Sequence, residues 1–184
     1  MGFYKRYDKK TIESFAKNTI SEKYDKKYSS YYSPSNSDNF DYISPLREDA
    51  IEITTAIPEN EMNYYVFETQ KAKGKSNLNY EKVKGLKLNA NGEMKRYYGG
   101  SLQEIIELIY DRLESKQKKA LKRTESKSYK HIDLCVCIQD GSLLDLSSFQ
   151  REFSNLGKYI FDKIFFITPS HFIVYEKDTG LYEC

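Results

Sequence analysis

Two carboxylates, Asp41 and Glu52, have the residue type and the spacing that could bind a metal ion. They belong to residues 39–57, which we interpret as a hairpin of two short strands closed symmetrically about the Leu46–Arg47 bond. Asp41 then lies opposite Glu52 on the same face, with Cβ atoms roughly 5 Å apart. Two carboxylates this close repel each other unless a cation lies between them, and Mg²⁺ is often bound through one or two carboxylates. The pair therefore predicts a magnesium site, with a surface hairpin of solvated acids as the alternative.

The second strand of this hairpin shows the alternation typical of a β-strand. Successive side chains of a strand point to opposite faces, so the odd-numbered and even-numbered positions separate. The first face carries Ile51, Ile53, Thr55 and Ile57, and the second carries Ala50, Glu52, Thr54 and Ala56. One face is therefore apolar, while the acid and the hydroxyl group of Thr54 share the other.

The composition is that of a globular protein with a real core. The chain has 184 residues, of which 39% are hydrophobic and 30% charged, and we expect a single domain over residues 1–184. No apolar run approaches the ~18 residues of a membrane span, and the N-terminus lacks the apolar region of a secretory signal. Residues 1–10 and 28–39 are polar or rich in Ser and Tyr, which favours flexible segments.

Cysteine and histidine usage argues against several kinds of site. Cys135 and Cys137 lie in an apolar stretch and Cys184 is the last residue, so they form no disulfide framework. A reducing, cytoplasmic compartment is therefore expected. His131 and His171 have no ligand spacing to the cysteines, which argues against a zinc site and against catalysis by a Cys-His arrangement. No glycine-rich phosphate loop is present in the sequence.

The segment from residue 115 to residue 130 is strongly basic, although the net charge of the chain is only +2. Such a run can follow a phosphate backbone. It is equally typical of a solvated helix end, where lysine and arginine complement the helix dipole. The candidates for nucleic-acid contacts are Lys116, Lys119, Lys122 and Arg123.

Hydrophobic periodicity and capping signals predict the elements that position these residues. A long helix is expected from Ser101 to about Arg123, because apolar residues repeat at helical spacing and Ser101 forms a capping box with Glu104. Other helices are expected within residues 1–28, from about 58 to 73, and from a cap at Ser147–Ser148 to about 161. Strands are expected at 131–139, 163–167, 171–176 and 180–183. With the hairpin, this order predicts an α/β (α+β) fold, a central mixed β-sheet flanked by helices.

The hairpin and the elements after it resemble the PD-(D/E)XK nuclease superfamily, which has the restriction-endonuclease-like fold. That family carries an acid at the end of one strand and an acid-x-lysine pair on the next. The segment 40–43, FDYI, is similar to the first part, and the segment 50–54, AIEIT, is similar to the second. Several small members continue with a lysine-bearing helix, a tyrosine and an apolar strand. This chain is similar over residues 10–176, with Ile109, Leu113, Lys116, Lys119, Tyr129 and the strand at 131–139.

The chain departs from the family at one position of the motif. Thr54 stands where the family usually has lysine, and threonine supplies no positive charge to the attacked phosphate. A lysine from elsewhere in the chain can take that role, and the candidates are Lys71, Lys73 and Lys116. Glu13 matches the loose expectation of an acid on the first helix.

The resemblance also implies a set of site residues and a mechanism. Gln70 is similar to a glutamine that some exonuclease-like members use near the site, and it joins Asp41, Glu52 and Thr54 as a catalytic candidate. Mg²⁺ (or Mn²⁺) would be held by Asp41, Glu52 and the backbone carbonyl of Ile53. The ion would activate water and polarise the scissile phosphate. The expected activity is cleavage of DNA phosphodiester bonds.

Three functions remain open on the sequence alone. The first is the metal-dependent nuclease, with DNA as its partner; many restriction-like nucleases act as dimers, so the resemblance also allows a homodimer. The second is a catalytically inactive nuclease-like domain that binds nucleic acid or protein, which Thr54 and the modest net charge favour. The third is an unrelated α/β domain in which the two acids are incidental.

Overall fold

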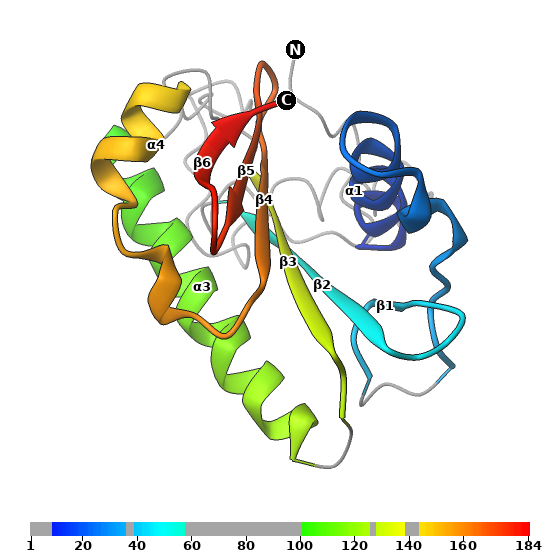
Figure 1. Cartoon of the computed structure of the whole chain (residues 1–184). Coiled ribbons are helices and arrows are strands. Elements are labelled where there is room, and N and C mark those ends of the chain that lie inside the picture. Colours follow the sequence, from blue (N-terminus) through cyan, green and yellow to red (C-terminus); the bar gives the residue numbers. More distant parts are fainter. Residues whose placement is uncertain (1–8, 36–38, 58–100, 126–127, 139–143) are drawn as a thin grey trace, which may run out of the picture.

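A six-stranded mixed sheet lies at the centre of the fold, and its strands follow one another in chain order (Figure 1). The computed structural model describes residues 9–35, 39–57, 101–125, 128–138 and 144–184. The strands are β1 (Tyr42–Ile43), β2 (Asp49–Ala56), β3 (His131–Ile138), β4 (Lys163–Ile167), β5 (Phe172–Glu176) and β6 (Gly180–Glu183). The pairs β2–β3 and β3–β4 are parallel, and the other three pairs are antiparallel. The prediction of a central mixed sheet flanked by helices is therefore confirmed.

Strands β1 and β2 form the hairpin that the sequence predicts. Tyr42 pairs with Ile51 and Ile43 pairs with Ala50, so the register symmetrical about the loop is confirmed. Strand β1 has two residues and β2 has eight, so β1 covers only the beginning of β2. From Ile53 onward, the edge of β2 has no strand partner from β1.

Helix α3 (Leu102–Thr124) precedes β3 in the chain and packs on β2. It begins as predicted, because the side chains of Ser101 and Glu104 each accept a hydrogen bond from the backbone N–H of the other. A parallel pair such as β2–β3 needs a crossover connection, and α3 lies within it. The residues that α3 buries repeat at helical spacing: Ile105, Ile106, Ile109, Leu113 and Ala120.

Helix α4 (Leu146–Glu152) shares the α3 side of the sheet and begins differently from the prediction. Its N-cap is Asp145, whose carboxylate accepts from the Ser148 N–H at 2.8 Å and from the Ser147 hydroxyl at 2.9 Å. These hydrogen bonds lower the pKa of Asp145 to about 2. A carboxylate before the first turn satisfies the free N–H groups, so the two serines lie inside the helix.

Helix α4 also ends earlier than predicted, at Glu152 instead of near residue 161. Phe153 leaves the helical conformation, with φ −115° and ψ 46°, and its side chain is buried. Its ring lies 5.2 Å from the ring of Phe149 and 5.8 Å from that of Phe166, measured between centroids. The chain continues in the short 3₁₀ helix η3 (Leu156–Lys158). Burial of this ring under the sheet thus accounts for the early end.

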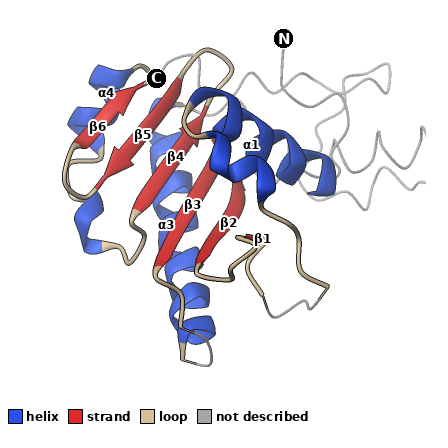
Figure 2. Ribbon diagram, turned by 45° about the vertical axis from the view of Figure 1, so that its right-hand side comes forward, coloured by secondary structure: helices blue, strands red, loops and turns tan. Residues whose placement is uncertain are grey.

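Helix α1 (Lys9–Lys23) covers the opposite face of the sheet from α3 (Figure 2). Ile12, Ala16 and Ile20 are buried and form a stripe with a spacing of four residues. They pack in one cluster with Ile51, which belongs to the odd-numbered face of β2. Strand β2 is therefore buried on both faces, under α1 on one side and under α3 on the other.

The 3₁₀ helix η1 (Lys26–Ser30) follows on the α1 side of the sheet. It overlaps residues 28–39, for which the sequence predicts a flexible segment. From the segment 28–39, Tyr28 and Tyr31 are buried, with 0% and 3% of the residue exposed. Their ring centroids lie 5.0 Å apart. Tyr32 forms an isolated antiparallel bridge to Ile43 of β1. Aromatic packing and this bridge thus tie residues 28–32 to the sheet.

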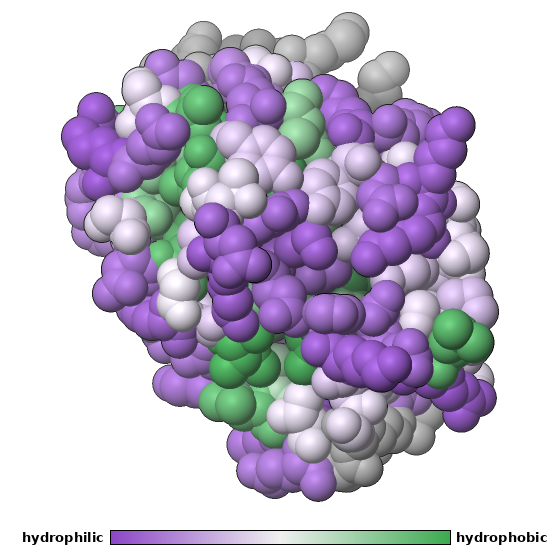
Figure 3. Space-filling view, viewed as in Figure 1, coloured by the Kyte–Doolittle hydropathy of each residue, from purple (hydrophilic) through white to green (hydrophobic). Residues whose placement is uncertain are grey.

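The face of the molecule shown in Figure 3 is largely hydrophilic, with hydrophobic side chains in smaller groups between the polar ones. Scattered hydrophobic residues are normal on the surface of a folded protein. In the described part of the chain, no helix is both long and apolar enough to cross a membrane. The helix expected at residues 58–73, with Gln70, lies outside the described residues.

Candidate functional site

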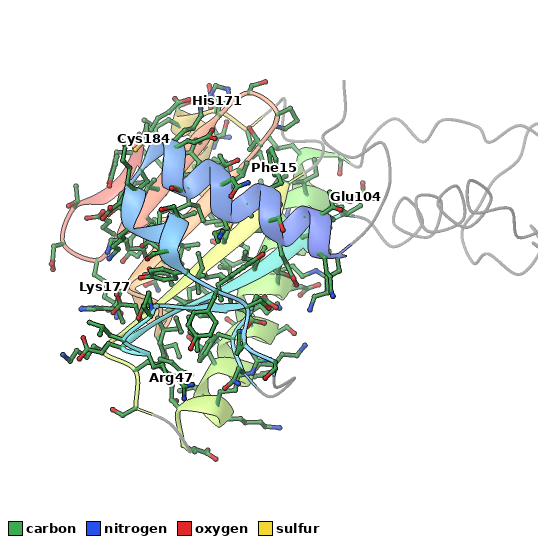
Figure 4. The ribbon with its side chains drawn as sticks, turned by 90° about the vertical axis from the view of Figure 1, so that its right-hand side faces the viewer. Phe15, Arg47, Glu104, His171, Lys177 and Cys184 are labelled. Carbon is green, nitrogen blue, oxygen red and sulfur yellow. The ribbon has the colours of Figure 1, made fainter. Side chains whose placement is uncertain are left out.

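A pocket of about 260 Å³ lies beside β2, between α1 and α3. Figure 4 shows α1 in front of the sheet and α3 behind it, so the pocket joins the two helix layers at the part of β2 that β1 leaves uncovered. Four of the lining side chains are cations and one is an acid. The lining residues are Lys9, Ile12, Glu13, Ile53, Thr54, Thr55, Arg112, Ser115, Lys116 and Lys119.

Glu52 is a buried carboxylate next to this pocket, with 2% of the residue exposed. Its Oε1 accepts from Lys116 Nζ at 2.5 Å, and its Oε2 accepts from Arg123 Nη1 at 2.5 Å. The even-numbered position of Glu52 points it toward α3, where both cations lie two turns apart on one helix face. A charge at this depth is tolerated only with such partners, because an unpaired buried carboxylate costs several kcal/mol.

Lys116 is one of the three lysines that the sequence offers in place of the motif lysine, and in the structure it lies next to Glu52. Besides Glu52, its Nζ donates to the backbone carbonyl oxygen of Ile53 at 3.3 Å. These are two of the oxygen groups that the nuclease resemblance assigns to a metal ion. The other two candidates, Lys71 and Lys73, lie outside the described residues.

Asp41 lies just before β1, and its carboxylate closes the uncovered edge of β2. Its Oδ2 accepts from the Ile53 N–H at 2.7 Å, and its Oδ1 accepts from Lys9 Nζ at 3.4 Å. A backbone N–H beyond the last pair of β1 needs another acceptor, and the side chain of Asp41 provides it. Asp41 and Glu52 are thus linked through Ile53, because Lys116 joins Glu52 to the carbonyl of the same residue.

Glu13 of α1 is a second acid beside Asp41. Lys9 Nζ lies 3.1 Å from Glu13 Oε1 and 3.4 Å from Asp41 Oδ1, so one ammonium group bridges the two carboxylates. Desolvation raises the pKa of Glu13, and the charge of Asp41 raises it further, while Lys9 lowers it. The acid that the sequence matches only loosely to the first helix therefore lines the pocket.

Thr54 and Gln70 complete the catalytic candidates of the sequence. Thr54 follows Glu52 by two positions on the same face of β2, is half-buried and lines the pocket. Gln70 lies outside the described residues. Asp41 therefore contacts Ile53 through its N–H group, and Glu52 and Thr54 flank Ile53 in β2.

The four basic candidates on α3 lie in different surroundings. Lys116 and Arg123 hold the two oxygens of Glu52. Lys119 is exposed and lines the pocket, and Lys122 is exposed elsewhere on the helix. Lys116 and Arg123 thus form intramolecular ion pairs. A third residue, Lys119, lines the pocket and is exposed to solvent.

The oxygen atoms around Ile53 are the kind of donor that Mg²⁺ prefers. Glu52 Oε1 and the Ile53 carbonyl oxygen converge on Lys116 Nζ, and Asp41 lies beside a second ammonium group, that of Lys9. Among the described residues, no three acidic, histidine or cysteine side chains form a group that could hold a metal ion. Mg²⁺ requires only one or two carboxylates, because it keeps several of its waters. In this structure the Lys116 ammonium lies on the Glu52 and Ile53 oxygens that such an ion would need.

Two pocket residues, Lys9 and Arg112, are not among the candidates that the sequence predicts. Lys9 precedes the apolar stripe of α1 and belongs to no motif. Arg112 lies four residues before Lys116 and seven before Lys119, so all three share one face of α3. This helical spacing is the signal that could have identified Arg112 from the sequence.

The fold class does not by itself indicate what the pocket does. The described residues form a mixed α/β fold with a six-stranded mixed sheet and helices packed on both faces. A fold of this class carries many unrelated activities, so a function must be argued from the pocket itself. The chain matches no protein-family model, and neither a curated protein nor a solved structure is significantly similar to it.

Proposed function

We propose that this protein is a metal-dependent nuclease that cleaves DNA phosphodiester bonds, with a restriction-endonuclease-like fold. The observation that carries this proposal is the position of Lys116, whose Nζ lies 2.5 Å from Glu52 Oε1 and 3.3 Å from the Ile53 carbonyl oxygen. In the superfamily that the sequence resembles, a lysine two positions after the acid supplies this charge, and this chain has Thr54 there. Lys116 brings the positive charge to the same acid from a helix instead.

The order of elements supports the proposal. Helix α1 precedes the β1–β2 hairpin and supplies Glu13, the hairpin supplies Asp41 and Glu52, and α3 then leads into the parallel strand β3. Strand β4 adds to β3 in parallel, as the next element of the sheet. This is the order of elements over which the sequence resembles the nuclease superfamily.

Each residue has a role that its chemistry supports. Asp41, Glu52 and the Ile53 carbonyl would hold Mg²⁺ or Mn²⁺, which when bound supplies an activated water and polarises the scissile phosphate. The Lys116 ammonium stabilises negative charge on the phosphate oxygens. Thr54 lines the pocket and can donate a hydrogen bond from its hydroxyl to the same phosphate.

The proposal is tested by cleavage of linear, circular and single-stranded DNA with Mg²⁺ or Mn²⁺, using matched variants. Asp41→Asn removes a metal-binding charge and keeps an oxygen that can accept from the Ile53 N–H. Lys116→Gln removes the proposed catalytic charge. Lys118→Gln is the control, because Lys118 is an exposed lysine of the same helix that does not line the pocket.

We expect metal-dependent cleavage that Asp41→Asn and Lys116→Gln each reduce by about 10²-fold or more, the usual effect of losing one group that stabilises the transition state. Lys118→Gln should retain full activity. Thermal melting of each variant shows whether it is folded. Cleavage that survives Asp41→Asn would rule out the proposed site, and the absence of cleavage on every substrate by folded protein would rule out the nuclease.

A second function, a catalytically inactive domain that binds nucleic acid, is favoured by the state of Glu52. Both of its carboxylate oxygens accept hydrogen bonds from cations of the chain itself. If Lys116 and Arg123 take the place of the metal permanently, no metal-activated water is available to cleave a bound nucleic acid. Calorimetric titration with Mn²⁺ separates the two functions: the nuclease binds the ion and loses it on Asp41→Asn, whereas the binding domain takes up DNA without metal.

A further inference from the structure

One wall of the pocket is a row of polar side chains on α3. Their spacing of three, four and seven residues places them on a single helix face that spans two turns. Strand β2 supplies two hydroxyl groups to the same pocket, from Thr54 and Thr55. The residues of the α3 wall are Arg112, Ser115, Lys116 and Lys119.

Arg112 has an incomplete set of hydrogen bonds in this wall. Its Nε is buried and has no hydrogen-bond partner within the described ranges of the chain. A buried donor without an acceptor costs about 1–3 kcal/mol, and more when it is charged. Arg112 also lines the pocket, where its guanidinium group is one of the available hydrogen-bond donors.

The positive charge of the pocket is concentrated at Arg112 and Lys119. Lys9 is paired with Glu13 and Asp41, and Lys116 is paired with Glu52. None of the ion pairs formed within the described residues involves Arg112 or Lys119. Among the described residues, Arg112 and Lys119 are therefore the two pocket cations without an ion-pair partner.

The size of the pocket limits what can enter it. Sites for drug-sized ligands usually measure about 300–1,000 Å³, and this pocket measures about 260 Å³. A polar pocket of this volume suits a compact group better than a long apolar ligand. A tetrahedral oxyanion matches both the size and the donors, which are a guanidinium, an ammonium and three hydroxyl groups.

We propose that Arg112 and Lys119 bind the terminal phosphate monoester of a nucleic-acid strand. The strand as the source of the phosphate rests on the proposed function, whereas the oxyanion site rests on the pocket alone. A monoester is a dianion near neutral pH, while an internal diester carries one charge. Two cations that form no ion pair within the described ranges therefore favour a strand end. Arginine also binds phosphate through two parallel hydrogen bonds, which adds geometric selectivity. The end of a strand would thus lie beside Glu52 and Lys116.

The test measures binding in EDTA, where no metal-dependent cleavage occurs. Fluorescence anisotropy at constant ionic strength compares single-stranded oligonucleotides that carry a 5′-phosphate, a 3′-phosphate or hydroxyl groups at both ends, each labelled at a site remote from the end compared. Inorganic phosphate is added as a competitor. The variants are Arg112→Gln and Lys119→Gln, with Lys118→Gln as the matched control on the exposed side of the same helix.

We expect one phosphorylated end to bind about tenfold or more tightly than its hydroxyl counterpart, which corresponds to one charge-assisted hydrogen bond. Inorganic phosphate should compete for it. Arg112→Gln and Lys119→Gln should each bring the ratio close to one, while Lys118→Gln keeps it. Equal affinity for all ends, or a preference that survives both pocket variants, would overturn the proposal.

The outcome is independent of the nuclease proposal. A phosphate preference in EDTA without cleavage in Mg²⁺ keeps the oxyanion site and rejects the enzyme. Cleavage in Mg²⁺ without a phosphate preference keeps the enzyme and rejects the oxyanion site. Because Lys119 is exposed, its variant is expected to fold even if a change at the partly buried Arg112 impairs folding.

Discussion

Two buried carboxylates on neighbouring strands, Glu52 of β2 and Asp133 of β3, are held in opposite ways. Glu52 points toward α3, where Lys116 and Arg123 each approach one of its oxygens to 2.5 Å. Asp133 lies on the α1 side, where its Oδ2 accepts from the Tyr28 hydroxyl at 2.7 Å. Its Oδ1 has no hydrogen-bond partner in the described part of the chain. The two residues are 2% and 1% exposed, so burial does not distinguish them.

The difference teaches which kind of buried acid belongs to a site. Burial raises the pKa of Asp133 to about 6, and the Tyr28 hydrogen bond and the more distant Lys163 lower it only in part. Asp133 can therefore avoid the cost of a buried negative charge by taking up a proton. Glu52 is instead held by two cations beside a polar pocket, so ion pairs offset the cost of its burial.

Glu52→Ala should have the largest effect on stability, because it leaves two cations without their counter-charge. We expect the free energy of unfolding to fall by about 3–5 kcal/mol, the usual cost of breaking a buried ion pair from one side. Chemical denaturation at pH 7 measures the change.

The control for this prediction removes the whole charged group. Glu52→Leu combined with Lys116→Met and Arg123→Met replaces three charges by apolar side chains of similar length. Most of the lost stability should return, because apolar replacement of a buried charge group is often neutral. If Glu52→Ala is as stable as the natural protein, the ion pairs are not formed in solution.

Asp133 should make the protein less stable as the pH rises from about 4 to about 6. Its ordinary pKa is 3.8 and its pKa in the folded protein is about 6, so between these values the unfolded chain loses the proton first. The contribution of Asp133 is complete below pH 4 and is lost as the pH passes 6, on the order of 3 kcal/mol in all. Unfolding free energies measured from pH 4 to pH 8 give the slope.

Asp133→Asn isolates this contribution from the other carboxylates. The variant keeps an oxygen that can accept from Tyr28 and carries no titrating group. Subtracting its unfolding free energies from those of the natural protein should leave a curve that falls with pH. A flat difference curve would mean that Asp133 is charged or solvated throughout, like an ordinary surface acid.

Tyr28→Phe should sharpen the contrast with a smaller effect. It removes the hydroxyl that bonds to Asp133 and leaves the ring in its contact with Phe165, 5.7 Å between centroids. We expect a loss of about 1–3 kcal/mol, the cost of an unsatisfied buried group. Because that hydrogen bond lowers the pKa of Asp133, the loss should be greater at pH 8 than at pH 4. An equal loss at both pH values would contradict the assignment.

The sequence was sufficient for the parts of the fold that local patterns determine. The alternation of β2 and the symmetry of its loop predicted the pairing of Tyr42 with Ile51, and the capping box predicted the start of α3 at Ser101. The apolar strands β3 and β4 also lie where periodicity places them. In each case the signal lies within a short segment of the chain.

The remaining features depend on contacts between distant segments. The sequence offered three lysines for the role of the motif lysine and no basis for choosing Lys116. Its contact with Glu52 joins residues far apart in the chain. The predicted end of α4 was wrong by several residues, because the burial of Phe153 ends the helix at Glu152. Asp133 lies in an apolar strand and was not singled out from the sequence. Its hydrogen bond from the Tyr28 hydroxyl joins distant parts of the chain and is seen only in the structure.

The strand order has a consequence for how the chain folds. Each strand lies beside its neighbour in the sequence, so the sheet can grow by one strand at a time from β1 toward β6. Short-range pairing is reached faster than long-range pairing, and the short-range pairs of this sheet are β1–β2, β4–β5 and β5–β6. The ion pairs of Glu52 instead join residues 64 and 71 positions apart, so they form only when α3 reaches β2. The pocket is therefore completed only when α1, β2 and α3 have come together.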